Sequence, residues 1–195
     1  MKYQELRKKI GKPIFTRQDL RLRRLKVFDY QLSLWQKQGQ ITKLKNGVYL
    51  FNEDADRIRP EDIALYLYAP SYISLEKALS IYGIIPEMVY SITSVTPKVT
   101  RRFKNKFGNF VYRHVKPLLF FGYHENQGIL LADPEKALLD YLYLNKIRTK
   151  EDLIEMRLNK KAIKELFRPK NFLKYLRVFS NPNLEELCTK YLKIK

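Results

Sequence analysis

The sequence is short of cysteine and of long apolar runs, and each shortage excludes a class of protein. Cys188 is the only cysteine, so an intramolecular disulfide is impossible, and with only two histidines we expect no structural metal site. The longest uncharged run, residues 63–75, contains Pro70 and is too short to span a bilayer. The first residues lack the apolar run of a secretory signal. These features predict a cytoplasmic protein with no membrane partner.

The signatures of nucleotide-binding and catalytic sites are also missing. Neither GxxxxGK[ST] nor GxGxxG occurs. The segment Asp133-Pro134-Glu135-Lys136, followed by Asp140, superficially resembles the acidic cluster of a metal nuclease. Adjacent Glu and Lys at the start of a helix do not give the spacing of such a site, and helix capping explains the acids. We therefore expect no catalytic residue, no metal and no cofactor.

Acidic residues are few, and the basic excess is concentrated in particular segments. The chain has 38 Lys and Arg against 20 Asp and Glu, a net charge of +18. Residues 1–52 carry 13 basic and 3 acidic side chains, and residues 98–117 carry 7 basic and none acidic. Such segregation favours a nucleic-acid partner. A lysine-rich genome is the plainer alternative, but it explains the lysines near the C-terminus better than the arginines of the first segment.

A change of composition marks the domain boundary. Residues 52–62, NEDADRIRPED, reverse the charge of the preceding segment and contain turn formers and a proline. We therefore expect two domains, residues 1–52 and residues 53–195.

The first domain has the pattern of three helices. Leu6 and Ile10 lie at helical spacing before Gly11, which ends the first helix. Thr16 and Asp19 form a capping box for the second. In a third helix that ends at Gly39, the stripe that we expect to pack inward consists of Phe28, Leu32 and Trp35.

A hairpin follows these helices. Residues 41–44 and 48–51 flank Lys45-Asn46-Gly47, and an Asn-Gly pair favours a type I′ turn. Three helices and a hairpin predict a winged helix-turn-helix, whose third helix enters the major groove of DNA.

The winged-helix geometry assigns roles to exposed polar residues. On the third helix, Tyr30, Gln31 and Ser33 are the expected readers of base edges. The expected phosphate contacts come from Arg17, Arg21, Lys26, Lys37, Lys43, Lys45 and Asn46. A second basic patch, expected between strands, consists of Arg101, Arg102, Lys104 and Lys106. It either extends the DNA contact, meets an acidic partner or is a solvated loop.

The remaining residues alternate between helical and strand patterns. Helices are expected at residues 60–68, 75–83, 134–146, 151–157, 160–179 with a break at Pro169, and 183–192. Ser74, Asp133 and Thr149 are expected to cap helices. Strands are expected at residues 90–96, 109–115, 118–123 and 129–132. The predicted fold class is α+β: an N-terminal winged helix-turn-helix, then a larger mixed α/β domain with a small sheet and a helical C-terminal segment.

Several long sequence segments occur in a particular order, starting in the predicted hairpin. GVYLF is followed by PSYISLEKALSIYGIIPE, ITSVTPKVTRRF, LFFGY and ADPEKALLDYLY. This series resembles the AbiEi family, the antitoxins of type IV toxin–antitoxin systems, over about residues 14–145. One departure is the basic, bulky link RLRRLKVF, where the family has a small turn containing glycine.

The resemblance implies an antitoxin that represses its own operon. Its winged helix would bind inverted repeats in operator DNA, and its second domain would counter a nucleotidyltransferase-like toxin, with or without direct contact. The symmetry of an inverted repeat favours a dimer or cooperative assembly on DNA. The alternative is a basic winged-helix module that binds a protein or RNA and regulates no promoter.

Overall fold

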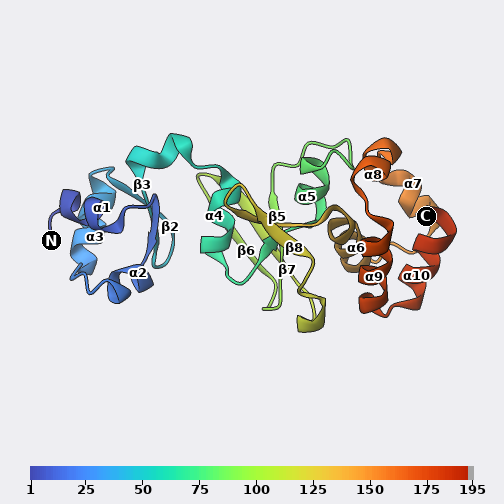
Figure 1. Cartoon of the computed structure of the whole chain (residues 1–195). Coiled ribbons are helices and arrows are strands. Elements are labelled where there is room, and N and C mark those ends of the chain that lie inside the picture. Colours follow the sequence, from blue (N-terminus) through green and yellow to red (C-terminus); the bar gives the residue numbers. More distant parts are fainter. Residues whose placement is uncertain (193–195) are drawn as a thin grey trace.

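The computed structural model describes residues 1–192, which fold into helices and two β-sheets along an elongated molecule (Figure 1). The chain is therefore α+β, as expected. An N-terminal unit lies at one end, a six-stranded sheet lies in the middle, and the last helices lie at the other end.

The N-terminal unit alternates helices with the strands of a small antiparallel sheet in the order β1-β3-β2. Its elements are α1 (Tyr3–Ile10), β1 (Ile14–Thr16), α2 (Arg17–Leu22), α3 (Asp29–Lys37), β2 (Ile41–Lys45) and β3 (Val48–Phe51). The 3-10 helix η1 (Asn52–Arg57) leads out of this unit.

The second unit is built on a mixed sheet in the order β6-β7-β5-β4-β9-β8. Its strands are β4 (Tyr72–Ile73), β5 (Ile92–Thr96), β6 (Arg101–Asn105), β7 (Gly108–His114), β8 (Tyr123–Asn126) and β9 (Ile129–Ala132). Its α-helices are α4 (Pro60–Leu67), α5 (Leu75–Ile81), α6 (Pro134–Leu144), α7 (Lys150–Glu155), α8 (Lys160–Leu166), α9 (Pro169–Phe179) and α10 (Pro182–Leu187). Two short turns, η2 (Pro117–Leu119) and the π-helical η3 (Cys188–Leu192), complete the described chain.

The first two helices form where the sequence predicts them. Leu6 and Ile10 are buried, and Gly11 ends α1 in the left-handed conformation with a φ of 67°. The capping box of α2 is confirmed: the Asp19 amide donates to Thr16 Oγ1, and the Thr16 amide donates to the Asp19 carboxylate. Local capping chemistry therefore fixes the start of α2.

The predicted inward stripe of the third helix is wrong at its first residue. Phe28 occupies the N-cap position of α3 in an extended conformation, and 58% of its surface is exposed. Because Phe28 precedes the helix, helical spacing does not align it with Leu32 and Trp35, which are buried as expected.

The hairpin is confirmed, although its turn differs from the expected type. Gly47 adopts a φ of 77°. A type I′ turn requires a positive φ at Asn46 as well, and Asn46 does not have one. A register shift between Lys43 and Lys45 accommodates the turn. Ile14 and Phe15, for which the sequence predicted no strand, add strand β1 beside β3.

The N-terminal sheet is buried on both faces, and each face belongs to a different core. Phe15 and Tyr49 are cross-strand partners that stack at 5.4 Å in the core shared with α1–α3. Their neighbours Ile14 and Leu50 point to the opposite face, into the core of the second unit. The side chains of Ile63, Ala64 and Leu67 on α4 are part of that second core. The small sheet is thus a layer between the two units.

The larger sheet confirms three of the four expected strands and adds three others. Strands β5, β7 and β9 match the predictions for residues 90–96, 109–115 and 129–132. The strand expected at residues 118–123 is wrong, because η2 begins at Pro117 and β8 starts only at Tyr123. The two-residue β4 is central, since it pairs antiparallel with β5 and parallel with β9.

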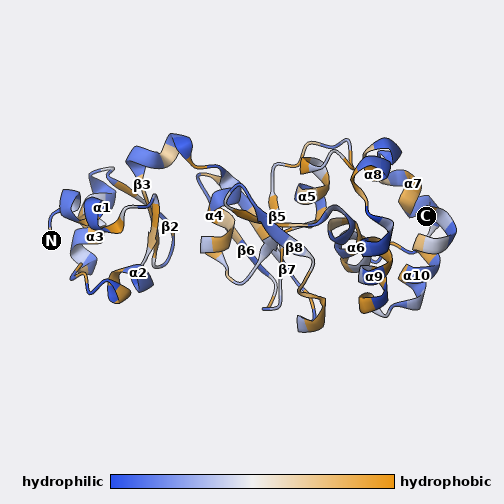
Figure 2. Cartoon of the chain, viewed as in Figure 1, coloured by the Kyte–Doolittle hydropathy of each residue, from blue (hydrophilic) through white to orange (hydrophobic). Residues whose placement is uncertain are grey.

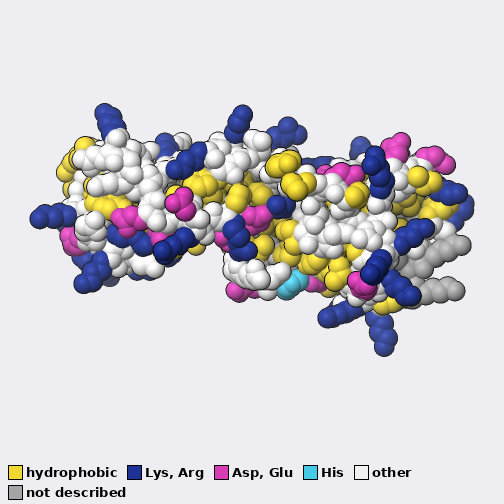
Figure 3. Space-filling view, turned by 90° about the horizontal axis from the view of Figure 1, so that it is seen from above, with side chains coloured by type: hydrophobic (Ala, Val, Ile, Leu, Met, Phe, Trp, Pro, Cys, Tyr) yellow, Lys and Arg dark blue, Asp and Glu magenta, His cyan; other side chains and the backbone are white. Residues whose placement is uncertain are grey.

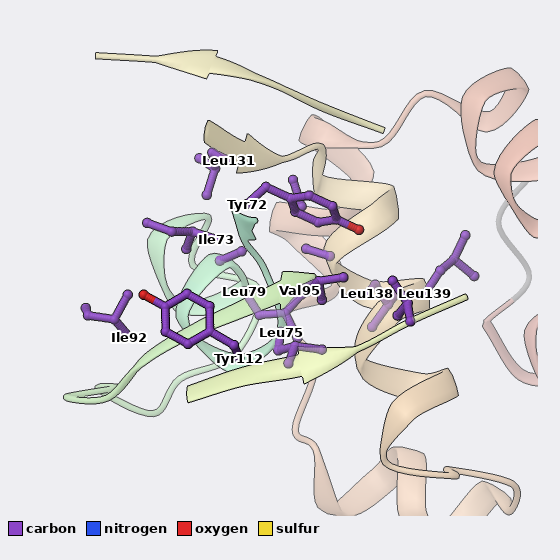
Figure 4. Packing of buried hydrophobic residues seen from close by; sticks show 14 of the residues in the cluster. Tyr72, Ile73, Leu75, Leu79, Ile92, Val95, Tyr112, Leu131, Leu138 and Leu139 are labelled. Carbon is purple, nitrogen blue, oxygen red and sulfur yellow. The ribbon is translucent and has the colours of Figure 1, made fainter. Parts of the chain in front are cut away.

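Figure 4 shows the part of the larger core to which this sheet, α5 and α6 contribute apolar residues. Helix α6 also brings an ion pair into it, because Lys136 and Asp140, one turn apart, are fully buried. The Asp140 carboxylate accepts hydrogen bonds from the Tyr72 hydroxyl at 3.0 Å and the Ser74 hydroxyl at 2.9 Å. Ser74 occupies the N-cap position of α5, as predicted. Its hydroxyl donates to Asp140, however, and makes no capping hydrogen bond to the helix.

The C-terminal helices follow their predicted caps and breaks. Thr149 caps α7 through a capping box with Asp152, and Pro169 begins α9 where a break was expected. The predicted helix at 183–192 is divided into α10 and η3. Figure 2 shows the hydrophilic colouring of η1, which leads from the N-terminal unit to the second unit.

The shared sheet predicts that the two units unfold together. Trp35, the only tryptophan, lies in the N-terminal core, so its fluorescence reports on that unit while far-ultraviolet circular dichroism reports on all helices. In urea, the two signals are expected to follow one transition. Leu50→Ala is expected to lower the free energy of unfolding by about 3 kcal/mol and to shift both signals equally.

Leu118→Ala is the matched control, because 74% of Leu118 is exposed. Two separate transitions, or a Leu50→Ala effect seen by tryptophan fluorescence alone, would contradict the shared layer.

Candidate nucleic-acid interface

Helix α3 presents one exposed face, and the exposed Asp29 lies at its first turn. Tyr30, Ser33, Leu34 and Lys37 follow helical spacing and are all exposed, while Leu32 and Trp35 on the other face are buried. The structure therefore keeps two of the three predicted base readers, Tyr30 and Ser33, side by side. Leu34, 47% exposed, was missed because an apolar residue in a helix is ordinarily assigned to the core.

The prediction that Gln31 lies on the exposed face is wrong. Only 9% of Gln31 is exposed, and its side-chain oxygen accepts a hydrogen bond from the Phe28 amide at 3.0 Å. Its side-chain nitrogen donates to the Met1 carbonyl at 2.8 Å. Gln31 thus closes the first turn of α3 and joins α3 to the chain start. A glutamine three residues after the N-cap is a capping signal, and the sequence contains it.

Large apolar side chains are exposed around the start of α3. Phe28 and Tyr30 stack with ring centroids 5.8 Å apart and an interplanar angle of 12°. Leu22, at the end of α2, is 75% exposed. Tyr30 belongs to the exposed face of α3, so Phe28 lies beside that face. Exposed apolar side chains of this kind can contact either the methyl groups of bases or a protein surface.

The link between α2 and α3 contains an arginine with strained backbone geometry. Arg24 has a φ of 53°, a left-handed conformation that normally favours glycine. Arg17, at the start of α2, forms an ion pair of 2.6 Å with Asp29 at the start of α3. Arg17 remains 53% exposed, so it lies at the predicted surface with its charge partly balanced. Arg21 and Lys26 are exposed in the same region, as expected.

The hairpin contributes Lys43 and Asn46 to the surface, but Lys45 needs correction. Lys43 and Asn46 are exposed, whereas the Lys45 ammonium group donates to the Leu67 carbonyl and lies 5.7 Å from the Phe103 ring. Burial lowers the pKa of Lys45, with further lowering by the positive charges of Lys98 and Arg101. Lys45 is a contact between the two units and is no longer a candidate phosphate ligand.

The second basic patch forms on an edge strand and not in a loop. Arg101, Arg102 and Lys104 belong to β6 and are exposed, and Lys106 lies in the turn that follows. Phe103, between them, packs against Tyr68 and Tyr112. The packing of Phe103 therefore fixes the strand, while the cations on either side of it remain in solvent.

A series of contacts joins α3, the hairpin and β6. Arg17 pairs with Asp29 of α3, and its amide donates to the Gly47 carbonyl in the hairpin turn at 2.9 Å. On the other side of the hairpin, Asn105 of β6 donates to the Leu44 carbonyl at 3.5 Å. The two basic segments of the sequence are therefore neighbours in space. Figure 3 shows Lys and Arg side chains projecting from the N-terminal unit.

The acidic segment around α6 is engaged internally. Asp133 accepts a hydrogen bond from the Tyr175 hydroxyl at 2.7 Å, and its other oxygen lies 2.7 Å from His124 Nδ1. It therefore occupies the N-cap position of α6 without capping it, contrary to the prediction. Glu135 accepts from the Arg168 amide at 2.5 Å. Within residues 1–192, no three His, Cys, Asp or Glu side chains gather as a metal ion would need.

Comparison with known proteins finds no family model that matches the chain and no curated protein with significant similarity. Over residues 1–192, the structure contains no helix with the length and apolar character needed to cross a bilayer. The arrangement of surface residues is thus the basis for assigning a function.

The start of α2, which positions Arg17, is expected to weaken in acid. Burial raises the pKa of Asp19, but hydrogen bonds from Lys12 and Thr16 outweigh this and hold it below its ordinary value. A lowered carboxyl pKa stabilises the fold above the ordinary pKa, and this contribution is lost as the pH falls through the lowered value. Asp19→Asn is expected to lower the free energy of unfolding by about 1 kcal/mol at pH 7, with the difference shrinking below about pH 4.

Urea unfolding at several pH values measures this difference. Asp56→Asn, which changes an exposed carboxylate, is the control and is expected to have little effect. A difference between wild type and Asp19→Asn that stays constant from pH 7 to about pH 2 would rule out this role of the carboxylate.

Proposed function

We propose that the chain is an antitoxin and transcriptional autorepressor of the AbiEi type, acting in the cytoplasm. Its N-terminal unit acts as a winged helix-turn-helix: α3 enters the major groove of operator DNA, and the β2–β3 hairpin lies beside it as the wing. Two features support this assignment: the order of the helices and the hairpin, and the series of sequence segments from GVYLF to ADPEKALLDYLY that resembles this family.

The proposal rests above all on the exposed face of α3 within a basic surround. Tyr30 and Ser33 offer hydroxyl groups to base edges, and Leu34 offers an apolar contact for a thymine methyl group. Lys37 and Lys43 supply nearby positive charge, and the strand β6 extends it. Phosphate contacts of this kind position a protein on DNA, while the contacts to bases select the sequence.

The second unit, in this proposal, counters a nucleotidyltransferase-like toxin. Among the sequence segments that carry the resemblance, the residues Tyr72, Lys136 and Asp140 interact with one another in the larger core. They therefore maintain the fold, and the toxin would have to be opposed through surface residues or through expression of the operon. Inverted repeats in the operator would be bound by a dimer or by cooperative monomers.

The second candidate function is a module that binds protein or RNA without regulating a promoter. The exposed Leu22, Phe28 and Leu34 favour it, because such apolar side chains suit a protein contact. Equal, salt-sensitive binding to every DNA duplex would support this candidate and contradict autorepression.

The two remaining base readers are expected to determine sequence selectivity. Binding of the full chain to a duplex from its own upstream region is compared with binding to a shuffled duplex by fluorescence anisotropy. Tyr30→Ala and Ser33→Ala are each expected to reduce the ratio of the two affinities by about tenfold. Lys170→Ala, on the exposed side of α9, is the control. An unchanged ratio in both α3 variants would refute the placement of α3 in the major groove.

The corrected phosphate contacts make a separate prediction about salt dependence. Lys43→Ala, Arg101→Ala and Arg102→Ala are each expected to reduce the slope of log affinity against log salt by about 1, with selectivity preserved. Lys45→Ala is expected to leave the slope unchanged, because its ammonium group contacts Leu67. A normal slope in both arginine variants would remove β6 from the DNA surface.

A further inference from the structure

The last helices form a groove that the proposed DNA contact does not use. It has a volume of about 690 Å³ and lies between α7, α8 and the turn η3. Tyr191 and Leu192 of η3 close one side of it. We call this feature the C-terminal groove.

Each helix that lines the C-terminal groove gives it apolar and cationic side chains together. Helix α7 and the residue just beyond its end contribute Lys150, Leu153, Ile154 and Arg157. The first three follow the i, i+3, i+4 spacing of a single helix face. Ile154 is 62% exposed, so this face lacks the apolar partner that it would otherwise have in a core.

Helix α8 repeats the pattern on the facing wall. Lys160, Ile163 and Lys164 line the groove at i, i+3, i+4, and Phe167 follows at the end of the helix. The carboxylates of these helices, Glu151, Asp152, Glu155 and Glu165, are absent from the lining. Among the described residues, the charged side chains that line the groove are therefore all positive, and they lie beside an apolar floor. Figure 3 shows hydrophobic side chains at this end of the molecule together with Lys, Arg, Asp and Glu.

We infer that the C-terminal groove binds an acidic amphipathic helix of a protein partner. An apolar stripe at i, i+3, i+4 and i+7 would lie on the floor of the groove, as in other cases where a helix binds in a groove. Glutamate or aspartate residues beside that stripe would face Lys150, Arg157, Lys160 and Lys164. Charge complementarity selects an acidic partner, and the apolar floor disfavours the phosphate backbone of a nucleic acid.

The inference is tested with the full chain and a labelled synthetic peptide of about 16 residues, with Leu at i, i+3, i+4 and i+7 and Glu mainly elsewhere. Fluorescence anisotropy is expected to show saturable binding. Ile154→Asp is expected to weaken it at least about tenfold, and Lys160→Glu with Lys164→Glu to a similar extent. Matched controls on α9, Leu173→Asp and Lys170→Glu with Lys174→Glu, are expected to retain binding.

Several results would overturn the inference. These are no saturable binding up to about 1 mM peptide, equal binding of a peptide with Lys in place of Glu, or equal losses in the α9 controls. Peptide binding that appears only in the variant Ile194→Asp would mean that the end of this chain, and not a partner, occupies the groove. Loss of affinity for the upstream duplex in the groove variants alone would assign it to nucleic acid, whereas failure of the DNA proposal leaves the peptide result unaffected.

Discussion

The burial of both faces of the β1-β3-β2 sheet is the constraint on which the arrangement of the molecule depends. In β3, Tyr49 points into the N-terminal core, and its neighbour Leu50 points into the core of the second unit. A shift of β3 by one residue would exchange these faces and disrupt both cores. The same sheet carries the hairpin turn, so α3 and β6 are held on either side of it. The exposed cations of both units therefore form a surface with a fixed geometry.

Local signals in the sequence predicted the helices well, because caps act over three or four residues. The capping boxes of Thr16 with Asp19 and of Thr149 with Asp152 both form as expected. The same rule, applied to Gln31, would have placed it at the start of α3 and not on the exposed face. The stripe based on Phe28 failed because an N-cap residue lies outside helical periodicity.

Contacts between distant segments were not predictable in this way. The position of Lys45 depends on Leu67 and Phe103, which follow it by many residues, so its local pattern resembled that of the exposed Lys43. Strand β6 was missed because three of its five residues are cations, and only its pairing with β7 shows that they belong to a strand. Ser74 and Asp133 stand where caps were predicted, yet tertiary partners take their side chains. The sequence thus predicted most of the residues of the candidate surface. The contacts that bring these residues together depend on the fold and were not predicted.

Amide hydrogen exchange of the full chain, with and without a duplex from its own upstream region, tests most directly whether α3, the hairpin and β6 act as one DNA-binding surface. If they do, the duplex is expected to slow exchange together in residues 29–37, in the hairpin around residues 43–48 and in residues 101–105, and to leave α7 and α8 unchanged. Slower exchange in β6 alone, or no change in α3, would contradict a single DNA-binding surface.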